Sequence, residues 1–260
     1  MNEQEQKERL ANELHQNSPL GVGGMIFAAG LGTRFKPWTD KYPKALAEIN
    51  GKSLLQRNIE YLQQYGITDV VVNVHHFSDQ IINAVEQNNG WGSKIIISDE
   101  RDEVLETGGG LLKAKHLLSR RPFITINVDI LTDLNIHSLI EYHKQQHALI
   151  TLCIAERKTS RFLLFDEKNH LCGWRNIKAD GIIEKIVVYR KLLQQKAYSG
   201  IAFFEPEALD LIPFTGKFSL IDVYLALTTE HLVLGYDHSG DKWIDVGKPD
   251  SVALAESMFS

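Results

Sequence analysis

Short runs of apolar and β-branched residues alternate with longer amphipathic stretches from Gly24 onward. This alternation is typical of a mostly parallel sheet whose strands are joined by covering helices, so it predicts a doubly wound α/β core. We expect the strands of this part at residues 25–29, 69–74, 95–98, 123–127 and 149–154. We expect its helices at residues 53–66, 78–88, 110–119 and 135–146.

The first of these helices has recognisable signals at both ends. Ser53 and Gln56 form the pattern of a capping box, in which each side chain bonds the backbone N–H of the other residue. Gly66 is expected to end the helix, because glycine readily adopts the left-handed conformation that follows a last helical turn.

The pattern changes after residue 154 into shorter alternating runs, at residues 161–165, 170–175, 182–188 and 198–204. Such runs predict an antiparallel insertion instead of a further strand–helix–strand unit. The remaining elements are expected to be helices from Pro206 and Ser219, strands at 231–236 and 242–245, and a last helix from Pro249. Residues 1–18 predict a short polar helix, and the sequence contains no repeat of the β-helix kind, so no β-helix domain is expected.

The composition restricts the kinds of partner that the protein has. The 260-residue chain carries a formal net charge of −5, whereas binding to nucleic acid or to an anionic membrane requires a basic face. No apolar stretch reaches the ~18 residues of a membrane span, and the polar N-terminus does not resemble a secretory signal. Cys153 and Cys172 fit no zinc-binding spacing and are expected to be reduced, half-buried thiols. We therefore expect a cytoplasmic protein that binds neither nucleic acid nor membranes.

The most informative segment follows the first expected strand. It reads Ala28-Ala29-Gly30-Leu31-Gly32-Thr33-Arg34, and the cations Lys36, Lys41 and Lys44 stand close to it in a protein of negative net charge. Small residues and glycines at the end of a strand expose several backbone N–H groups without bulky side chains, which permits the close approach of a polyphosphate. We therefore predict a phosphate-binding loop at residues 28–34.

Two better-known phosphate motifs do not fit this chain. A dinucleotide-binding G-x-G-x-x-G fingerprint requires glycine at the position of Phe35, and its acidic residue is replaced by Val74 and His75 at the end of the second strand. Gly51-Lys52-Ser53 resembles the end of a P-loop, but the first glycine of that motif is replaced by Leu46. Lys52 and Ser53 are therefore assigned to a turn and a helix cap.

Two aspartates are expected at the carboxyl edge of the sheet, where ligands of open α/β folds bind. Asp129 follows an expected strand in the sequence Asn127-Val128-Asp129, and Asp245 ends another and is followed closely by Gly247. Each acid taken alone would more often be a helix cap or a loop residue, and the metal interpretation is favoured only when both are taken together with the glycine-rich loop. Mg²⁺ prefers carboxylates, water and substrate phosphates as ligands, which makes both acids candidate metal ligands.

Three adjacent glycines, Gly108-Gly109-Gly110, follow Leu105-Glu106-Thr107 ahead of the helix expected at 110–119. Glycines let backbone donors and acceptors approach the flat edge of a nucleobase. A flexible entry into the helix is the alternative. We expect a ligand-contacting loop here.

The run at residues 28–52, including Pro43-Lys44, resembles the signature of the sugar nucleotidyltransferases, a superfamily that makes nucleoside diphosphate sugars. The resemblance extends from about residue 25 to the C-terminus. It implies a Rossmann-like nucleotidyltransferase fold at residues 23–260, preceded by an N-terminal helical extension at 1–22. Within that domain we expect a nucleotide-binding part at 23–154, a smaller mixed sugar-binding insertion at 155–218 and a closing segment at 219–260.

The resemblance also implies roles for individual residues. Arg34 would hold the triphosphate and the leaving pyrophosphate, and Lys44 would stabilise the phosphates at the reacting centre. Asp129 and Asp245 would together bind Mg²⁺. The nucleotide-binding residues implied are Ala28, Ala29, Gly30, Leu31, Gly32, Thr33, Arg34, Gly108 and Gly109. The sugar-binding residues implied are Glu106, Gly109, Asn127 and Gly200.

The Glu-Thr-Gly-Gly-Gly form, with Ser199-Gly200-Ile201 downstream, is similar to a compact subgroup that includes N-acetylmuramate 1-phosphate uridylyltransferases. Mannose- and heptose-1-phosphate guanylyltransferases share much of it. The expected partners are therefore a nucleoside triphosphate and a sugar 1-phosphate, first UTP with N-acetylmuramate 1-phosphate and second GTP with a mannose or heptose 1-phosphate. A non-catalytic nucleotide-sugar-binding subunit is the alternative of another class. No feature of the sequence specifies an oligomeric state.

Three further groups each have two interpretations. Glu184-Lys185 resembles a pair that contacts sugar and phosphate in longer relatives, or it is an exposed strand pair. His75-His76 would approach the base or belong to a capped loop. The cations Arg157, Lys158 and Arg161 would meet an acidic substituent of the sugar or form a solvated basic turn.

Overall fold

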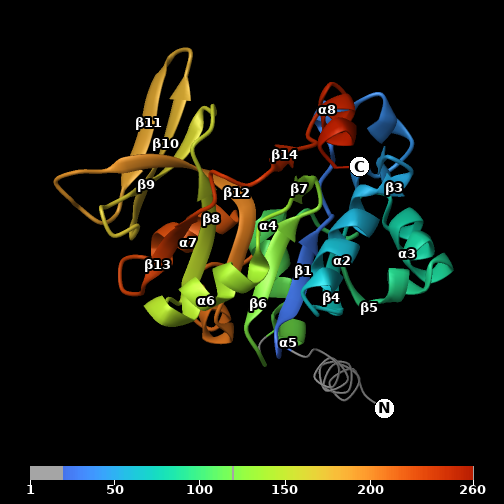
Figure 1. Ribbon diagram of the computed structural model, residues 1–260, viewed down its shortest axis with the longest axis horizontal. Coiled ribbons are helices and arrows are strands. Elements are labelled where there is room, and N and C mark those ends of the chain that lie inside the picture. The colour runs from blue at the N-terminus through green and yellow to red at the C-terminus, as the bar shows by residue number, and fades with distance from the viewer. Residues whose placement is uncertain (1–19, 119, 260) are drawn as a thin grey trace.

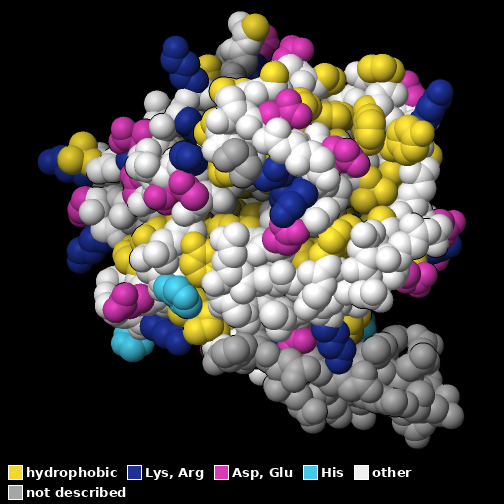
Figure 2. Space-filling view, turned by 45° about the vertical axis from the view of Figure 1, so that its right-hand side comes forward, with side chains coloured by type: hydrophobic (Ala, Val, Ile, Leu, Met, Phe, Trp, Pro, Cys, Tyr) yellow, Lys and Arg dark blue, Asp and Glu magenta, His cyan; other side chains and the backbone are white. Residues whose placement is uncertain are grey.

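The computed structural model describes residues 20–118 and 120–259, so the helix expected at residues 1–18 lies outside them. The described residues form a ten-stranded sheet with helices on both faces (Figure 1). Its strand order is β11-β10-β9-β12-β6-β1-β4-β5, with β8 paired to β12 and β13 paired to β8. On the face drawn in Figure 2, basic and acidic side chains are interspersed over the surface. No helix in the described part of the chain is long and apolar enough to cross a membrane.

Four parallel strands form the nucleus of the sheet, and they confirm the predicted strands of the N-terminal half. β1 (Gly23–Phe27) lies between β4 (Asp69–Val74) and β6 (Phe123–Asn127), and β4 also pairs with β5 (Lys94–Asp99). β1 ends two residues earlier than predicted, because the N–H of Ala28 donates to the Asn73 side chain at 2.8 Å. The carboxyl ends of these strands meet at one edge of the sheet.

Helices cover both faces of this nucleus, so the predicted doubly wound arrangement is confirmed. Side chains alternate along β1, with Ile26 in one apolar cluster and Met25 and Phe27 in the other. The first cluster contains residues of α2 (Leu54–Gln64), α3 (Ser78–Gln87), α6 (Ile136–Gln146) and α8 (Ser251–Met258). The second contains residues of α4 (Glu106–Lys113), α5 (Lys115–Leu118) and α7 (Leu220–Leu227).

The antiparallel insertion predicted after residue 154 is confirmed. Three strands form a meander that joins the beginning of the long strand β12 (Gln194–Phe204). They are β9 (Arg161–Phe165), β10 (Leu171–Lys178) and β11 (Gly181–Ile186). The rest of β12 runs antiparallel to β6 and to β8 (Ile150–Ala155), and β8 also pairs in parallel with β13 (Val233–Asp237). The insertion is therefore continuous with the main sheet, from which β10 and β11 project in Figure 1.

Local signals explain several element boundaries. A small hairpin of β2 (Glu48–Ile49) and β3 (Lys52–Ser53) precedes α2. Ser53 accepts the N–H of Gln56 at 3.1 Å, but the Gln56 side chain bonds Glu60, so only half of the predicted capping box forms. A complete capping box begins α7 at Ser219. The helix predicted from Pro206 is a 3-10 turn (Pro206–Leu209).

Both cysteines lie on strands in the interior of the sheet. Cys153 on β8 and Cys172 on β10 are free thiols without exposed surface, whereas the sequence predicted half-buried thiols. Burial raises the pKa of both groups. The thiols therefore stay protonated and unreactive.

The buried His143 makes the stability of the folded protein depend on pH in the acid range. His143 in α6 is 1% exposed, with Nδ1 at 2.7 Å from Oγ1 of Thr151 and Nε2 at 3.2 Å from the Glu205 carboxylate. Burial, with a smaller contribution from Lys144, lowers the pKa of His143 to about 4. The contact with Glu205 is therefore a hydrogen bond donated by a neutral imidazole.

We expect the free energy of unfolding to fall as the pH is lowered from 6.5 to 4. In this range the unfolded His143 takes up a proton and the folded one does not, which costs about 2–3 kcal/mol at the lower end. Chemical denaturation at a series of pH values measures the loss. In the His143→Gln variant, the free energy of unfolding should depend less steeply on pH. An equally steep decrease in this variant would show that other groups cause the effect.

Candidate active site

A short antiparallel ladder holds the two predicted metal ligands next to each other. β7 (Ile130–Thr132), which the sequence did not predict, pairs with β14 (Trp243–Asp245), and Asp245 lies opposite Ile130. The N–H of Val246 donates to the carbonyl of Asp129 at 2.8 Å. Since Asp129 directly precedes β7 and Asp245 ends β14, both acids lie where β6 ends.

Lys44 belongs to the same cluster. It begins a 3-10 turn (Lys44–Leu46), its side chain is only 10% exposed, and its ammonium group forms an ion pair with Asp129. A buried ammonium without a counter-ion is strongly unfavourable, so removal of either partner leaves an uncompensated charge. The pair therefore holds the loop after β1 against the end of β6.

Arg34 and Asp245 approach each other beside Gly247. A Cβ atom at Gly247 would lie 2.6 Å from Oδ1 of Asp245 and 3.0 Å from a terminal nitrogen of Arg34. Burial and the nearby Asp129 carboxylate raise the pKa of Asp245, whereas the surrounding cations oppose this shift. The four charged residues selected from the sequence thus lie together in one cluster.

The donor atoms of this cluster fit a magnesium ion. Oδ1 of Asp245 is buried and has no hydrogen-bond partner among the described residues. The ion pair with Lys44 uses Oδ2 of Asp129. A buried carboxylate oxygen without a donor is unfavourable, and Mg²⁺ accepts a few carboxylates together with water and phosphate oxygens. Within residues 20–118 and 120–259, no group of three or more His, Cys, Asp or Glu forms a closed metal cage.

Two cavities border the loop at residues 28–34. One has a volume of about 360 Å³, and its lining includes Ala29, Gly30, Leu31, Gly32, Thr33, Asn73, Glu100 and Glu106. The other has a volume of about 590 Å³, and its lining includes Arg34, Asn127, Asp129, Arg157, Gly200, Trp243 and Asp245. The predicted phosphate loop therefore lines the first cavity, while Asn127 and Gly200 lie beside both aspartates in the second.

The glycine-rich segment at residues 105–110 differs from its prediction. The sequence predicted a loop here, but α4 begins at Glu106 and includes all three glycines. The N–H groups of Gly108 and Gly109 donate to the carbonyl of Phe218 at 3.0 and 3.2 Å, so they are not free to bind a nucleobase. A Cβ atom at Gly108 would lie 2.4 Å from the Phe218 ring. These glycines therefore permit close packing of α4 against the segment before α7.

Two other predicted residues lie in different surroundings from those expected. Glu106, assigned to the sugar, lines the cavity of the phosphate loop and lies 3.7 Å from the ammonium group of Lys217. Ala28, assigned to the nucleotide, is buried with its N–H bonded to Asn73. Glu184 forms an ion pair with Arg175 at 2.5 Å on the projecting hairpin.

A buried polar pair that was not among the residues selected from the sequence lies at the smaller cavity. Asn73 donates to Oε1 of Glu100 at 2.9 Å, and burial raises the pKa of Glu100 although this hydrogen bond opposes the shift. His75 lines the same cavity, with Nδ1 at 2.7 Å from the carbonyl of Glu100. Asn73 is a polar residue within the apolar run at 70–74, and this was the available signal in the sequence.

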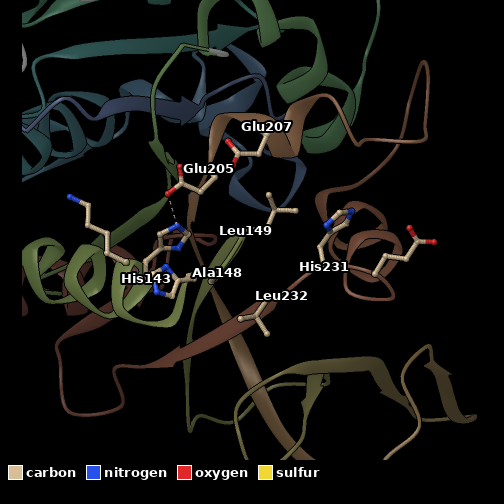
Figure 3. A pocket seen from close by; sticks show the side chains of 10 residues that line it. His143, Ala148, Leu149, Glu205, Glu207, His231 and Leu232 are labelled. Carbon is tan, nitrogen blue, oxygen red and sulfur yellow. Dashed lines mark hydrogen bonds and ion pairs between the residues drawn. The ribbon is translucent and has the colours of Figure 1, made fainter.

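A third cavity, of about 640 Å³, contains none of the residues selected from the sequence. Figure 3 shows His143, Glu205 and His231 around it. It lies where β8 begins, and β8 runs parallel to β6 because both strands are antiparallel to β12. This cavity is therefore at the opposite edge of the sheet from Asp129, and we assign the candidate active site to the carboxyl edge.

Known proteins share this arrangement of elements. The profile of a family described as nucleotidyl transferase matches residues 23–259. The chain is 31% identical over 241 residues to the N-acetylmuramate alpha-1-phosphate uridylyltransferase of Caulobacter vibrioides, covering 91% of this chain and 96% of that protein. It is 25% identical over 241 residues to mannose-1-phosphate guanyltransferase beta-A of Xenopus laevis, covering 90% of this chain and 64% of that protein.

A solved structure shows the same fold. HddC from Yersinia pseudotuberculosis, crystallised with GMP-PN, matches with a TM-score of 0.73 at 26% identity, over 92% of this chain and 100% of that chain. The chain belongs to the nucleotidyl transferase family, and it is a sugar-1-phosphate nucleotidyltransferase. These similarities favour an enzyme over the non-catalytic subunit that the sequence left as an alternative.

The close approach at Gly247 predicts that one added methyl group disrupts the cluster. Gly247→Ala should lower kcat/KM about 100-fold with little change in Tm, because the new Cβ must displace Asp245 or Arg34 by a fraction of an ångström or more. Gly240→Ala is the matched control, since a Cβ there meets nothing within 4 Å. Steady-state kinetics and thermal melting test both variants, and a fully active Gly247→Ala enzyme would contradict the arrangement.

Proposed function

We propose that the enzyme transfers a uridylyl group from UTP to N-acetylmuramate 1-phosphate and releases pyrophosphate, a step of cell-wall recycling. The observation that carries the proposal is the 31% identity to a uridylyltransferase for this sugar over 96% of that protein's length. The cluster at the carboxyl edge supports it, because it combines anion-binding and cation-binding groups beside two cavities. The proposed location is the cytoplasm.

In this reaction the nucleotide occupies the cavity of the phosphate loop, and the sugar 1-phosphate occupies the cavity beside Asn127 and Gly200. An oxygen of the sugar phosphate attacks the α-phosphorus, and the bond from that phosphorus to the bridging oxygen of the β-phosphate breaks. A phosphate oxygen is already ionised at neutral pH, so no general base is required. Arg34 neutralises the leaving pyrophosphate, and Lys44 neutralises charge around the α-phosphate.

Asp129 and Asp245 are the proposed ligands of Mg²⁺, which when bound supplies positive charge next to the phosphate oxygens of both substrates. Asp129 has a second task in this proposal, because its ion pair orients Lys44. Positioning and electrostatic stabilisation account for the rate in such a site, since the protein forms no covalent bond to the substrate.

A second candidate reaction joins GTP to a mannose or heptose 1-phosphate. The 25% identity to a mannose-1-phosphate guanyltransferase and the 26% identity to HddC, crystallised with GMP-PN, support it. We prefer the muramate reaction because the uridylyltransferase is more similar in sequence and is matched over nearly its whole length.

Pyrophosphate release from four nucleoside triphosphates, each offered with several sugar 1-phosphates, distinguishes the two candidates. We expect the highest kcat/KM for UTP with N-acetylmuramate 1-phosphate. A higher value for GTP with mannose 1-phosphate would support the second candidate and refute the first. Release with no sugar phosphate would refute both, since neither reaction uses water as the nucleophile.

The proposed metal ligands predict two inactive variants, of which Asp129→Asn should also lower Tm because it leaves Lys44 without its counter-ion. Asp129→Asn and Asp245→Asn should each lower turnover at least about 1,000-fold, because an amide removes the negative charge that holds the cation. Asp250→Asn, at an exposed position, is the control. Pyrophosphate release, thermal melting and calorimetric titration with Mg²⁺ test the three variants. Full activity of either site variant would remove that residue from the metal site.

A further inference from the structure

Arg157 is a half-buried cation that lines the larger cavity. Its guanidinium carbon lies 4.0 Å from the centroid of the Trp243 ring, and a terminal nitrogen donates to the carbonyl of Tyr198 at 2.5 Å. Its Nε is buried without a hydrogen-bond partner among the described residues. None of the ion pairs found in the described part of the chain involves Arg157, so its charge lacks a bound counter-ion there.

The elements around the active site hold this guanidinium in place. Trp243 lies on β14 two residues before Asp245, and its indole N–H donates to the carbonyl of Ser199 at 2.9 Å. Ser199 in turn precedes Gly200 on β12. An arginine stacked on an aromatic ring keeps the N–H groups at its edge available for a planar anion. The aromatic support is therefore continuous with the strands that carry Asp245 and Gly200.

The electrostatic setting of Arg157 is typical of a group completed by a ligand. Burial lowers the pKa of Arg157, and the attraction of Asp245 opposes this shift. Lys44, a more deeply buried cation of the site, has Asp129 as a direct counter-ion. A desolvated cation without such a partner is unfavourable. An anion entering the cavity would supply the missing charge.

The position of Arg157 indicates which anion this is. The proposed function assigns Arg34, Lys44 and the loop at residues 28–34 to the phosphates, whereas Arg157 stands at the start of the insertion and is stacked on Trp243 in the larger cavity. N-acetylmuramate differs from N-acetylglucosamine by a lactyl ether, which carries a carboxylate. The planar fork of an arginine matches a carboxylate through two parallel hydrogen bonds.

We propose that Arg157 binds a carboxylate substituent of the sugar and thereby selects acidic over neutral sugar 1-phosphates. This inference rests on the proposed function, for which it names the residue that reads the acidic group. Arg161 lines the exposed side of the same cavity and adds to its positive potential. The second terminal nitrogen, which is neither bonded to Tyr198 nor among the buried unpartnered atoms, is the donor that receives the carboxylate.

The test compares two sugars that differ only in the lactyl group. With UTP fixed, kcat/KM is measured for N-acetylmuramate 1-phosphate and for N-acetylglucosamine 1-phosphate, and their ratio is the selectivity. Arg157→Gln should lower this ratio about 10- to 100-fold, mainly through KM for the acidic sugar, because it removes a charge-assisted hydrogen-bonded pair. Lys158→Gln removes the same charge from an exposed neighbour and should leave the ratio unchanged.

Arg157→Lys keeps the charge but loses the fork, so the selectivity should fall to an intermediate value. This variant also provides the test if the glutamine variant fails to fold. If kcat/KM falls equally for both sugars in the folded variants, the selectivity ratio is unchanged and the proposal is overturned. Arg157 would then be assigned to the phosphate that both sugars share. A wild-type enzyme active only on neutral sugar phosphates would refute the proposed function as well. If the wild-type enzyme uses N-acetylmuramate 1-phosphate and the Arg157 variants keep its selectivity, the role of Arg157 is refuted and the proposed function stands.

Discussion

The ion pair between Lys44 and Asp129 is the contact on which the arrangement of the site depends. Lys44 is nearly buried, so its ammonium group needs a counter-ion within the protein. Asp129 supplies that charge while its carbonyl accepts the N–H of Val246. The loop after β1, the end of β6 and the strand β14 are thereby joined at one point. Arg34 and Asp245 then meet in the space that Gly247 leaves open.

The sheet supplies the second constraint, because one strand belongs to both parts of the site. β12 begins in the antiparallel insertion beside β9 and continues into the main sheet beside β6. Gly200 lies on it between these two stretches, with φ at +77° and with a Cβ position 3.0 Å from the Asn127 amide nitrogen. The cavity assigned to the sugar is therefore built on the same strand that borders the parallel nucleus. Its distance from the aspartates is determined by backbone pairing, which is stiffer than a loop connection.

Glycine has two distinct functions in this protein, and the one-letter pattern does not separate them. Gly30 and Gly32 belong to a loop that lines a cavity. Gly32 has a positive φ of +60°, which the turn at this position requires. In α4 it permits a helix to pack closely on Phe218 and on the carbonyl of Gly216. Both runs contain little side-chain bulk, but the glycines of the first line a cavity, whereas the N–H groups of Gly108 and Gly109 donate to the carbonyl of Phe218. The polar contacts at the smaller cavity come instead from Asn73 and Glu100.

The sequence by itself determined the alternation of strands and helices, the antiparallel insertion and the charged residues of the site, because periodicity and local motifs are properties of neighbouring positions. Only the tertiary structure decided which of these residues meet. The pairing of β7 with β14, the hydrogen bonds that occupy Gly108 and Gly109, and the stacking of Arg157 on Trp243 all join segments distant along the chain. Such contacts depend on strand register and side-chain packing in three dimensions, and no local pattern in the sequence encodes them.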